Sequence, residues 1–433
     1  MKKVAFHTLG CKVNQYETQA MGELFEKEGY EIVSDEEVAD VYVINTCTVT
    51  NVGDKKSRQF IRRAKRNNEE AIIAVVGCYA QTAPKEVLAI EGVNIVIGTN
   101  ERNKIVEAVE NCSTEEKISL VDDIMKVKQF EEMSIVDVKD KTRAFLKIQE
   151  GCNQYCTYCI IPYARGPIRS RGPLEIVEEV ETLVQKGFKE VVLTGIHVAS
   201  YGKDRSDGTD LIHILKQVNG AQGLERIRLS SLEPTLFTDD FLRELSQLDK
   251  ICDHFHLSLQ SGCNATLKRM NRKYTAEEYK EIAGRIRKVY PEVALTTDVI
   301  VGFPGETEEE FNTTYEFIKD IGFSEIHVFK YSPRTGTPAS KYKEQVDGLT
   351  KHYRSEKLID LGEKMKNQYR GQFVGKERKV LFEAISKENK AYMEGYTDNY
   401  LKVLVPASEV VEGELTNVVL KELKEEYILG EKK

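Results

Sequence analysis

The chain has 433 residues, of which 41% are hydrophobic and 30% are charged, and its formal net charge is -8. This composition is that of a globular protein with enough apolar residues for a buried core, and the length suggests about three domains. No apolar run reaches the length of a membrane span and the first residues turn polar too early for a signal peptide, so we expect a cytoplasmic protein that binds no membrane. The acidic balance gives no global sign of a polyanionic partner, so a nucleic acid would have to be bound by local basic patches.

Residues 1–112 alternate short apolar runs with amphipathic segments. The expected strands are Val4–Leu9, Val41–Thr46, Ile72–Gly77 and Asn94–Gly98. The two clearest helical patterns are Asn14–Glu28 and Asp54–Asn67. Strands that alternate with helices predict a parallel sheet with helices on its faces.

Three cysteines of this region, Cys11, Cys47 and Cys78, each stand just after one of the expected strands. Carboxyl ends of neighbouring parallel strands meet at a common crevice, so the three thiols are expected to converge there. This favours a three-thiolate cluster site, whereas the alternative is a set of three buried apolar cysteines. The remaining cysteines Cys112, Cys252 and Cys263 share no such pattern and are interpreted as structural, with Cys263 a weak exception because it follows Gln260-Ser261-Gly262 in an expected active-site loop.

A second cysteine set follows the apolar run Ala144–Ile148, in the string GCNQYCTYC with Cys152, Cys156 and Cys159. A 4Fe-4S cube takes four ligands, so three cysteines leave one iron open to a small molecule. An open iron is what reductive cleavage of S-adenosylmethionine requires, and the spacing therefore predicts radical chemistry. A structural zinc site is the alternative, but it would need a fourth ligand, and the nearest histidines in sequence are His7 and His197.

Residues 113–142 are charged and lack clean periodicity, which predicts an interdomain linker with room for a strand pair. Residues 143–370 return to alternation and form the predicted core. The six expected strands are Ala144–Ile148, Glu190–Leu193, Arg226–Leu229, His254–Leu259, Ala294–Val301 and Glu325–Phe329. The helices between them are expected around Leu174–Lys186, Asp210–Asn219, Asp239–Leu248, Glu277–Val289 and Glu308–Ile321. Six βα units predict a partial (βα)6 barrel whose site lies at the carboxyl ends of its strands. Residues 371–433 read as short strands between turns and predict a small, all-β barrel.

These segments resemble a known family over nearly the whole chain. GCNQYCTYCIIPYARGPIRSR is similar to the cluster segment of radical S-adenosylmethionine methylthiotransferases, and TLGCKVNQYET to the amino-terminal signature of the subgroup that acts on threonylcarbamoyladenosine in tRNA. TTDVIVGFPGET and YSPRTGTPA are further segments of this kind, and the tail resembles the RNA-binding TRAM barrel. The resemblance implies that the enzyme adds a methylthio group to carbon-2 of that nucleoside at position 37, next to the anticodon.

The same resemblance implies two 4Fe-4S clusters, one held by Cys152, Cys156 and Cys159 and an auxiliary one held by Cys11, Cys47 and Cys78. It also implies S-adenosylmethionine, tRNA, a low-potential electron donor and a sulfur donor, and we expect a monomer. Contacts to S-adenosylmethionine are proposed because they follow strand ends on one face of the barrel: Tyr158, Thr194, Gly195, Ser231, Glu233, Gly302, Pro304 and Gly305.

Two basic stretches are candidates for RNA contact, although such runs are also common on solvated helix faces. They are Asp54–Arg66, which includes Arg62, Arg63 and Arg66, and the cluster-loop residues Arg165, Arg169 and Arg171. Related enzymes that modify isopentenyladenosine or a ribosomal-protein aspartate remain alternatives, as does an iron-sulfur RNA-binding sensor without turnover.

Overall fold

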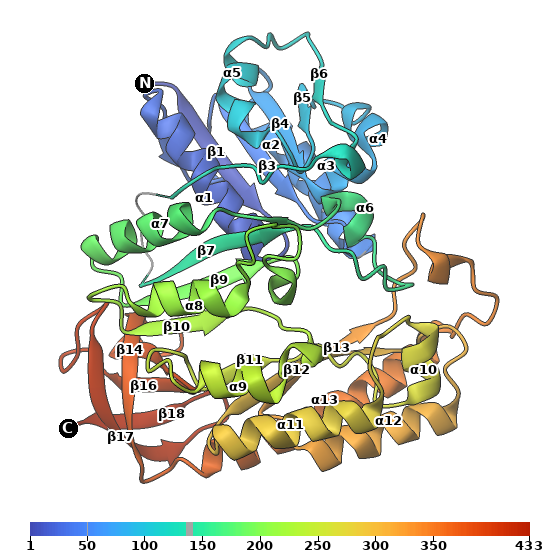
Figure 1. Cartoon of the computed structure of the whole chain (residues 1–433). Coiled ribbons are helices and arrows are strands. Elements are labelled where there is room, and N and C mark those ends of the chain that lie inside the picture. The colour runs from blue at the N-terminus through green and yellow to red at the C-terminus, as the bar shows by residue number, and fades with distance from the viewer. Residues whose placement is uncertain (50, 136–141) are drawn as a thin grey trace.

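The computed structural model describes residues 1–49, 51–135 and 142–433 and consists of three parts that follow one another along the chain (Figure 1). The first part is a six-stranded parallel sheet in the order β2-β1-β3-β4-β5-β6. Its strands are β1 (Lys3–Thr8), β2 (Glu31–Val33), β3 (Val41–Thr46), β4 (Ile72–Gly77), β5 (Ile95–Ile97) and β6 (Ile118–Leu120). Its helices are α1 (Lys12–Lys27), α2 (Asn51–Asn67), α3 (Cys78–Thr82), α4 (Pro84–Leu88) and α5 (Ile105–Glu110).

The parallel α/β sheet expected for the first part is confirmed, and β3 is buried along its whole length, as a strand with helices on both faces must be. Two edge strands, β2 and β6, were not expected, because three residues are too few to show a period. β6 lies within the predicted linker, so the sheet extends past residue 112. Residues 136–141 of that linker lie outside the described residues.

The second part is the partial barrel. One sheet has the order β10-β9-β7-β8 and the other the order β11-β12-β13, and isolated bridges from Ile227 to Ile251 and from Leu232 to Leu257 connect them. The strands are β7 (Arg143–Glu150), β8 (Arg169–Ser170), β9 (Glu190–Gly195), β10 (Arg226–Leu229), β11 (His254–His256), β12 (Ala294–Val301) and β13 (Glu325–Lys330). The surrounding helices are α6 (Ile161–Arg165), α7 (Pro173–Gln185), α8 (Leu211–Asn219), α9 (Asp239–Leu245), α10 (Asn264–Arg269), α11 (Ala276–Val289) and α12 (Glu308–Ile321).

All six predicted core strands are present, although β11 ends at His256 rather than at Leu259. A long helix, α13 (Gly348–Gly371), was not predicted. The Asp347 side chain caps its start by accepting hydrogen bonds from the backbone N–H groups of Leu349 and Thr350, at 2.9 and 3.0 Å. Helix α13 lies against β13 and leads into the third part (Figure 1).

The third part is a closed barrel with the order β14-β15-β16-β18-β17, as expected for the tail. Its strands are β14 (Glu377–Ile385), β15 (Tyr392–Thr397), β16 (Lys402–Pro406), β17 (Leu415–Leu423) and β18 (Ile428–Lys432), and they enclose a small apolar core of their own. Arg226 and Arg228 of β10 attach it by donating to main-chain carbonyls of residues 379 and 396–398, at 2.6 to 3.2 Å. No helix within the described residues combines the length and apolar character of a membrane span.

Candidate active site

The core cysteines lie in the loop that joins β7 to α6. Gly151 opens this loop with φ +74°, and a Cβ there would come within 1.9 Å of the Pro167 carbonyl oxygen, so the close approach requires glycine. Burial raises the pKa of Cys152 to about 11 and that of Cys159 to about 12, and the nearby thiol of Cys156 adds to both shifts. The three thiols are therefore close enough to interact electrostatically, and iron would have to displace their protons on binding.

The first-domain cysteines also come together, as their place after successive strands predicts. Cys11 precedes α1, Cys47 follows β3, and Cys78 begins α3 directly after β4. Gly10 lies against Cys47, because a Cβ on Gly10 would come within 2.9 Å of the Cys47 Cβ. Burial raises the pKa of Cys78 to about 12, and Cys47 and Cys11 raise it further while Arg165 opposes them.

The donor sets fit iron-sulfur cubes better than single metal ions. A single metal ion needs several His, Cys, Asp or Glu ligand atoms close together. Within the described part of the chain, one group of three such residues has all its ligand atoms within 4.8 Å of one another, namely His256, Asp298 and His327. Both sets consist of cysteines alone, and cysteine thiolates are the donor type that such clusters take.

A buried charge network connects the helix that follows the core cluster loop with an auxiliary cysteine. Arg165 of α6 is fully buried and its Nε donates to the Cys78 Sγ at 3.1 Å. Its other nitrogens donate to Glu17 Oε1 at 2.5 Å and to Asn14 Oδ1 at 2.7 Å, both on α1. A side chain that begins six residues after Cys159 therefore contacts an auxiliary cysteine directly.

A cavity of about 230 Å³ opens beside the core cysteines. Tyr158 and Cys159 form one wall, Val49 of the first domain another, and β12 and β13 contribute Asp298 and Phe329. Both domains thus line the space next to the cluster loop.

Of the eight predicted cofactor contacts, Tyr158 lines this cavity within the described residues. The others lie at strand ends, as predicted. Glu233 is buried and accepts from Arg272 Nη2 at 2.9 Å, while Arg272 Nη1 approaches the Cys156 Sγ at 3.4 Å. The remaining six are Thr194, Gly195, Ser231, Gly302, Pro304 and Gly305, and Ser231 is exposed.

The loop after β12 is fixed by Glu306. Its carboxylate accepts from the backbone N–H of Gly302 at 2.6 Å and from Arg354 Nη1 at 2.7 Å. Arg272 and Arg354 were missed by sequence reasoning, because a single arginine far along the chain carries no pattern that links it to a cysteine or to a loop.

The prediction that Arg165, Arg169 and Arg171 contact RNA is wrong, because all three side chains are buried. Arg165 pairs with Glu17, and Arg171 Nη1 pairs with Glu179 at 2.5 Å. The basic helix α2 does present an exposed face, which includes Lys55, Lys56, Arg62 and Arg66. Arg63 is partly buried and pairs with Asp35 at 2.7 Å.

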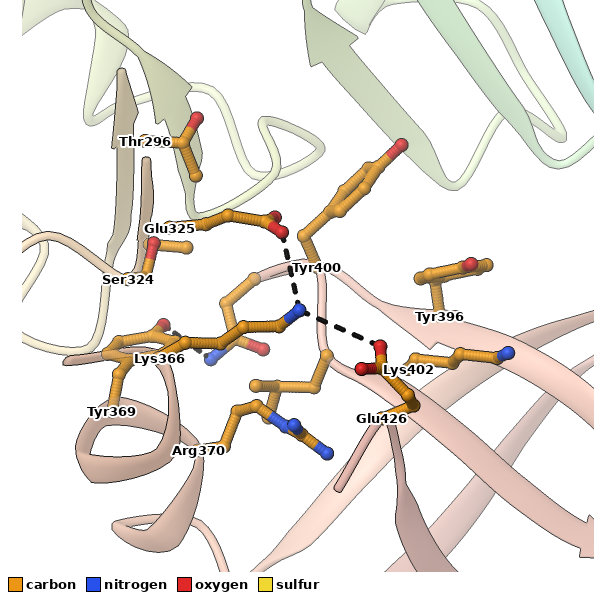
Figure 2. A pocket seen from close by; sticks show the side chains of 13 residues that line it. Thr296, Ser324, Glu325, Lys366, Tyr369, Arg370, Tyr396, Tyr400, Lys402 and Glu426 are labelled. Atoms are coloured by element: carbon orange, nitrogen blue, oxygen red, sulfur yellow. Dashed lines mark hydrogen bonds and ion pairs between the residues drawn. The ribbon is translucent and has the colours of Figure 1, made fainter. Parts of the chain in front are cut away.

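A second cavity, of about 310 Å³, lies between the amino ends of β12 and β13, α13 and the third part (Figure 2). The ammonium of Lys366 in this cavity is already paired, since its Nζ lies 3.4 Å from Glu325 and 3.9 Å from Glu426. Arg370 donates to the main-chain carbonyls of Glu425 and Lys424. This cavity therefore lies at the junction between the second and third parts, and no cluster cysteine lines it.

Comparison with known proteins gives two family matches. A family described as the Radical SAM superfamily matches residues 146–318, and one described as Uncharacterized protein family UPF0004 matches residues 3–98. The chain is 49% identical to "Threonylcarbamoyladenosine tRNA methylthiotransferase MtaB" of Bacillus subtilis over 96% of its length and 93% of that relative. It is 44% identical to the protein of the same name from Aquifex aeolicus, over 92% and 96%.

A further relative, "tRNA-2-methylthio-N(6)-dimethylallyladenosine synthase" of Thermoanaerobacter, is 37% identical over 99% of this chain and 93% of its own length. Among solved structures, the radical S-adenosylmethionine methyltransferase TsrM of Kitasatospora setae matches with a TM-score of 0.56 at 16% identity, covering 78% of this chain and 75% of that one. At that identity the match supports the fold.

Proposed function

The chain belongs to the family of tRNA methylthiotransferases with a radical SAM core, and on that premise we propose that it adds a methylthio group to carbon-2 of threonylcarbamoyladenosine at tRNA position 37. The relatives named for this nucleoside are more similar to the chain than the one named for dimethylallyladenosine, which favours the first substrate. A ribosomal-protein aspartate has no such support.

We assign Cys152, Cys156 and Cys159 to the 4Fe-4S cluster that binds S-adenosylmethionine, and Cys11, Cys47 and Cys78 to an auxiliary cluster. When bound, these groups would supply the radical, the sulfur and the methyl group, because carbon-2 of adenine is neither nucleophilic nor acidic in its C–H bond. Tyr158 would form the wall beside the cofactor. Arg272 and Arg165 would each hold one cysteine, Cys156 and Cys78, in orientation through N–H donors.

The observation that carries the proposal is the presence of two separate cysteine trios within a chain of this family, with Arg165 of α6 in contact with Cys78. Iron and sulfide content after anaerobic purification tests the cluster assignment. About eight of each per chain are expected for two cubes, and about four for Cys78→Ser with the core cluster retained. Four in the unaltered protein would contradict the second cluster.

Nucleoside analysis tests the reaction. Transfer RNA from a deletion strain should lack the methylthio form of threonylcarbamoyladenosine and keep the unthiolated form, and reintroducing the gene should restore it. An RNA-binding sensor would instead leave the nucleosides unchanged, and it would release no deoxyadenosine from S-adenosylmethionine under reducing conditions.

A further inference from the structure

We propose that Lys12, together with His256, Asp298 and His327, binds the threonylcarbamoyl group of the substrate and selects the modified adenosine over an unmodified one. The proposal deepens the function proposed above and rests on it. It assigns the carboxylate of the threonyl group to Lys12 and the imidazoles, and its hydroxyl or ureido N–H groups to Asp298.

The histidines and the aspartate form one polar cluster on neighbouring strands. Asp298 of β12 stands directly opposite His327 of β13, and His256 lies on β11 on the other side of β12. His256 Nε2 lies 3.4 Å from Asp298 Oδ2, and the rings of His256 and His327 stack with centroids 5.9 Å apart.

The cluster has unused hydrogen-bonding capacity. The 3.4 Å approach of His256 Nε2 to Asp298 is not a hydrogen bond, so this buried nitrogen has no hydrogen-bond partner among the described residues. The Nδ1 of the same ring lies 3.0 Å from the Thr296 hydroxyl, which fixes the ring. A buried polar atom without a partner is costly, so a ligand that supplies one is favoured.

Lys12 adds an unpaired positive charge to this region. It follows Cys11 at the start of α1, and its ammonium makes no hydrogen bond or ion pair with any residue in the described part of the chain. Burial lowers the pKa of Lys12, Arg228 and Arg143 lower it further, and Tyr400 and Glu190 raise it. Both Lys12 and His256 act on the buried imidazole of His254, whose pKa burial and Arg228 already lower.

This surplus of positive charge decides between two kinds of ligand. His256, Asp298 and His327 have the residue types of a transition-metal site. Arg228 and Arg143 near Lys12 are paired with Glu190 and Glu383, so the ammonium of Lys12 is the positive charge left over. It disfavours a divalent cation and favours an anion. A carboxylate that also carries hydrogen-bond donors fits all four side chains.

The substrate can reach the cluster from the cavity beside Cys159. Asp298 belongs to both, and Phe329 lines the cavity with 48% of its surface exposed. Phe329 and His327 are two residues apart on β13, so they share a face about 7 Å apart along the strand. An adenine stacked on Phe329 would direct its N6 substituent toward His327.

The test compares anticodon stem-loop RNA with and without the threonylcarbamoyl group at position 37. Lys12→Gln and His327→Ala are the variants, and Lys27→Gln, an exposed change at the other end of α1, is the matched control. We expect kcat/KM on the modified RNA to fall about 10- to 100-fold in each variant, the range for losing a charged hydrogen bond. Binding of the unmodified RNA should change less than about twofold.

Iron content and deoxyadenosine release without RNA are measured alongside, and both should match the unaltered protein. His327→Ala, remote in sequence from every cluster cysteine, keeps the test valid where Lys12→Gln loses iron. An unaltered enzyme that does not distinguish the two RNAs would refute the proposed function and this inference with it. Preference for the modified RNA that survives in both variants would refute the inference alone, as would one bound zinc or cobalt ion per chain that is lost in His327→Ala.

Discussion

Replacing Arg165 by methionine tests how the two cysteine sites are coupled. The guanidinium is fully buried and donates to the Cys78 Sγ at 3.1 Å, to Asn14 at 2.7 Å and to Glu17 at 2.5 Å. Methionine keeps much of the side-chain volume and removes every donor, so the change isolates the polar contacts.

The expected loss of stability follows from the ion pairs that remain around Glu17 in this variant. Arg102 Nη1 at 2.5 Å and Lys147 Nζ at 3.2 Å still neutralise Glu17, while Cys78 loses its guanidinium donor. Removing one partner of a buried ion pair costs about 3–5 kcal/mol, and the surviving cations place the expected loss toward the lower end. The auxiliary cluster, if held by Cys78, should lose occupancy in addition.

The matched control is Arg171→Met. Arg171 is also buried and pairs with Glu179 at 2.5 Å. Both variants should lower the unfolding free energy of the cofactor-free chain in urea by a similar amount. Only Arg165→Met should also lower iron and sulfide from about eight per chain toward four.

Two results would refute this reasoning. If Arg165→Met retains full iron and sulfide, the contact to Cys78 does not support a cluster there. If Arg171→Met loses as much iron as Arg165→Met, the loss reflects general destabilisation.

Two further predictions concern the surface and the barrel junction. Arg62→Glu with Arg66→Glu on α2 should weaken tRNA binding and reduce the slope of log affinity against log salt by about two, while the exposed control Arg243→Glu should leave it unchanged. An unaltered slope in filter-binding titrations would remove this patch from the tRNA interface. Burial alone would raise the pKa of Glu190, but Arg228 and two further arginines outweigh it and lower that pKa. The ionised Glu190 therefore stabilises the fold above the ordinary glutamate pKa of about 4.3, and this stability is lost as the pH falls through the lower pKa of the folded state. The unfolding free energies of Glu190→Gln and the parent, measured in urea, should therefore approach each other as the pH falls below about 4.3. A constant difference between the two at every pH would contradict this.

Much of the fold follows from the sequence because its signals are local. The apolar runs that form β3, β4 and β12 are long enough to show strand character. Their alternation with helices indicates that the strands run parallel. The places of the six cysteines were predictable for the same reason, since each stands at a strand end or in one short loop. Short edge strands such as β2 and the charged helix α13 carry too little pattern to be predicted.

The side chains around the site were harder to predict. Arg165, Arg169 and Arg171 read as surface charges beside a cluster loop, and tertiary packing buries all three. The partners that neutralise Arg165 and Arg171 lie elsewhere in the chain, on α1 and α7. No local pattern reports such pairing, so burial of charge is visible only once the domains are assembled.

The way in which β10 holds the C-terminal β-barrel affects how the barrel sequence can change. Arg226 and Arg228 donate hydrogen bonds to backbone carbonyl oxygens of the barrel, and every amino acid supplies such an oxygen regardless of its side chain. Substitutions on the outer face of that β-barrel can therefore accumulate without loosening its attachment. The barrel surface can thus vary in sequence while its position relative to β10 stays fixed.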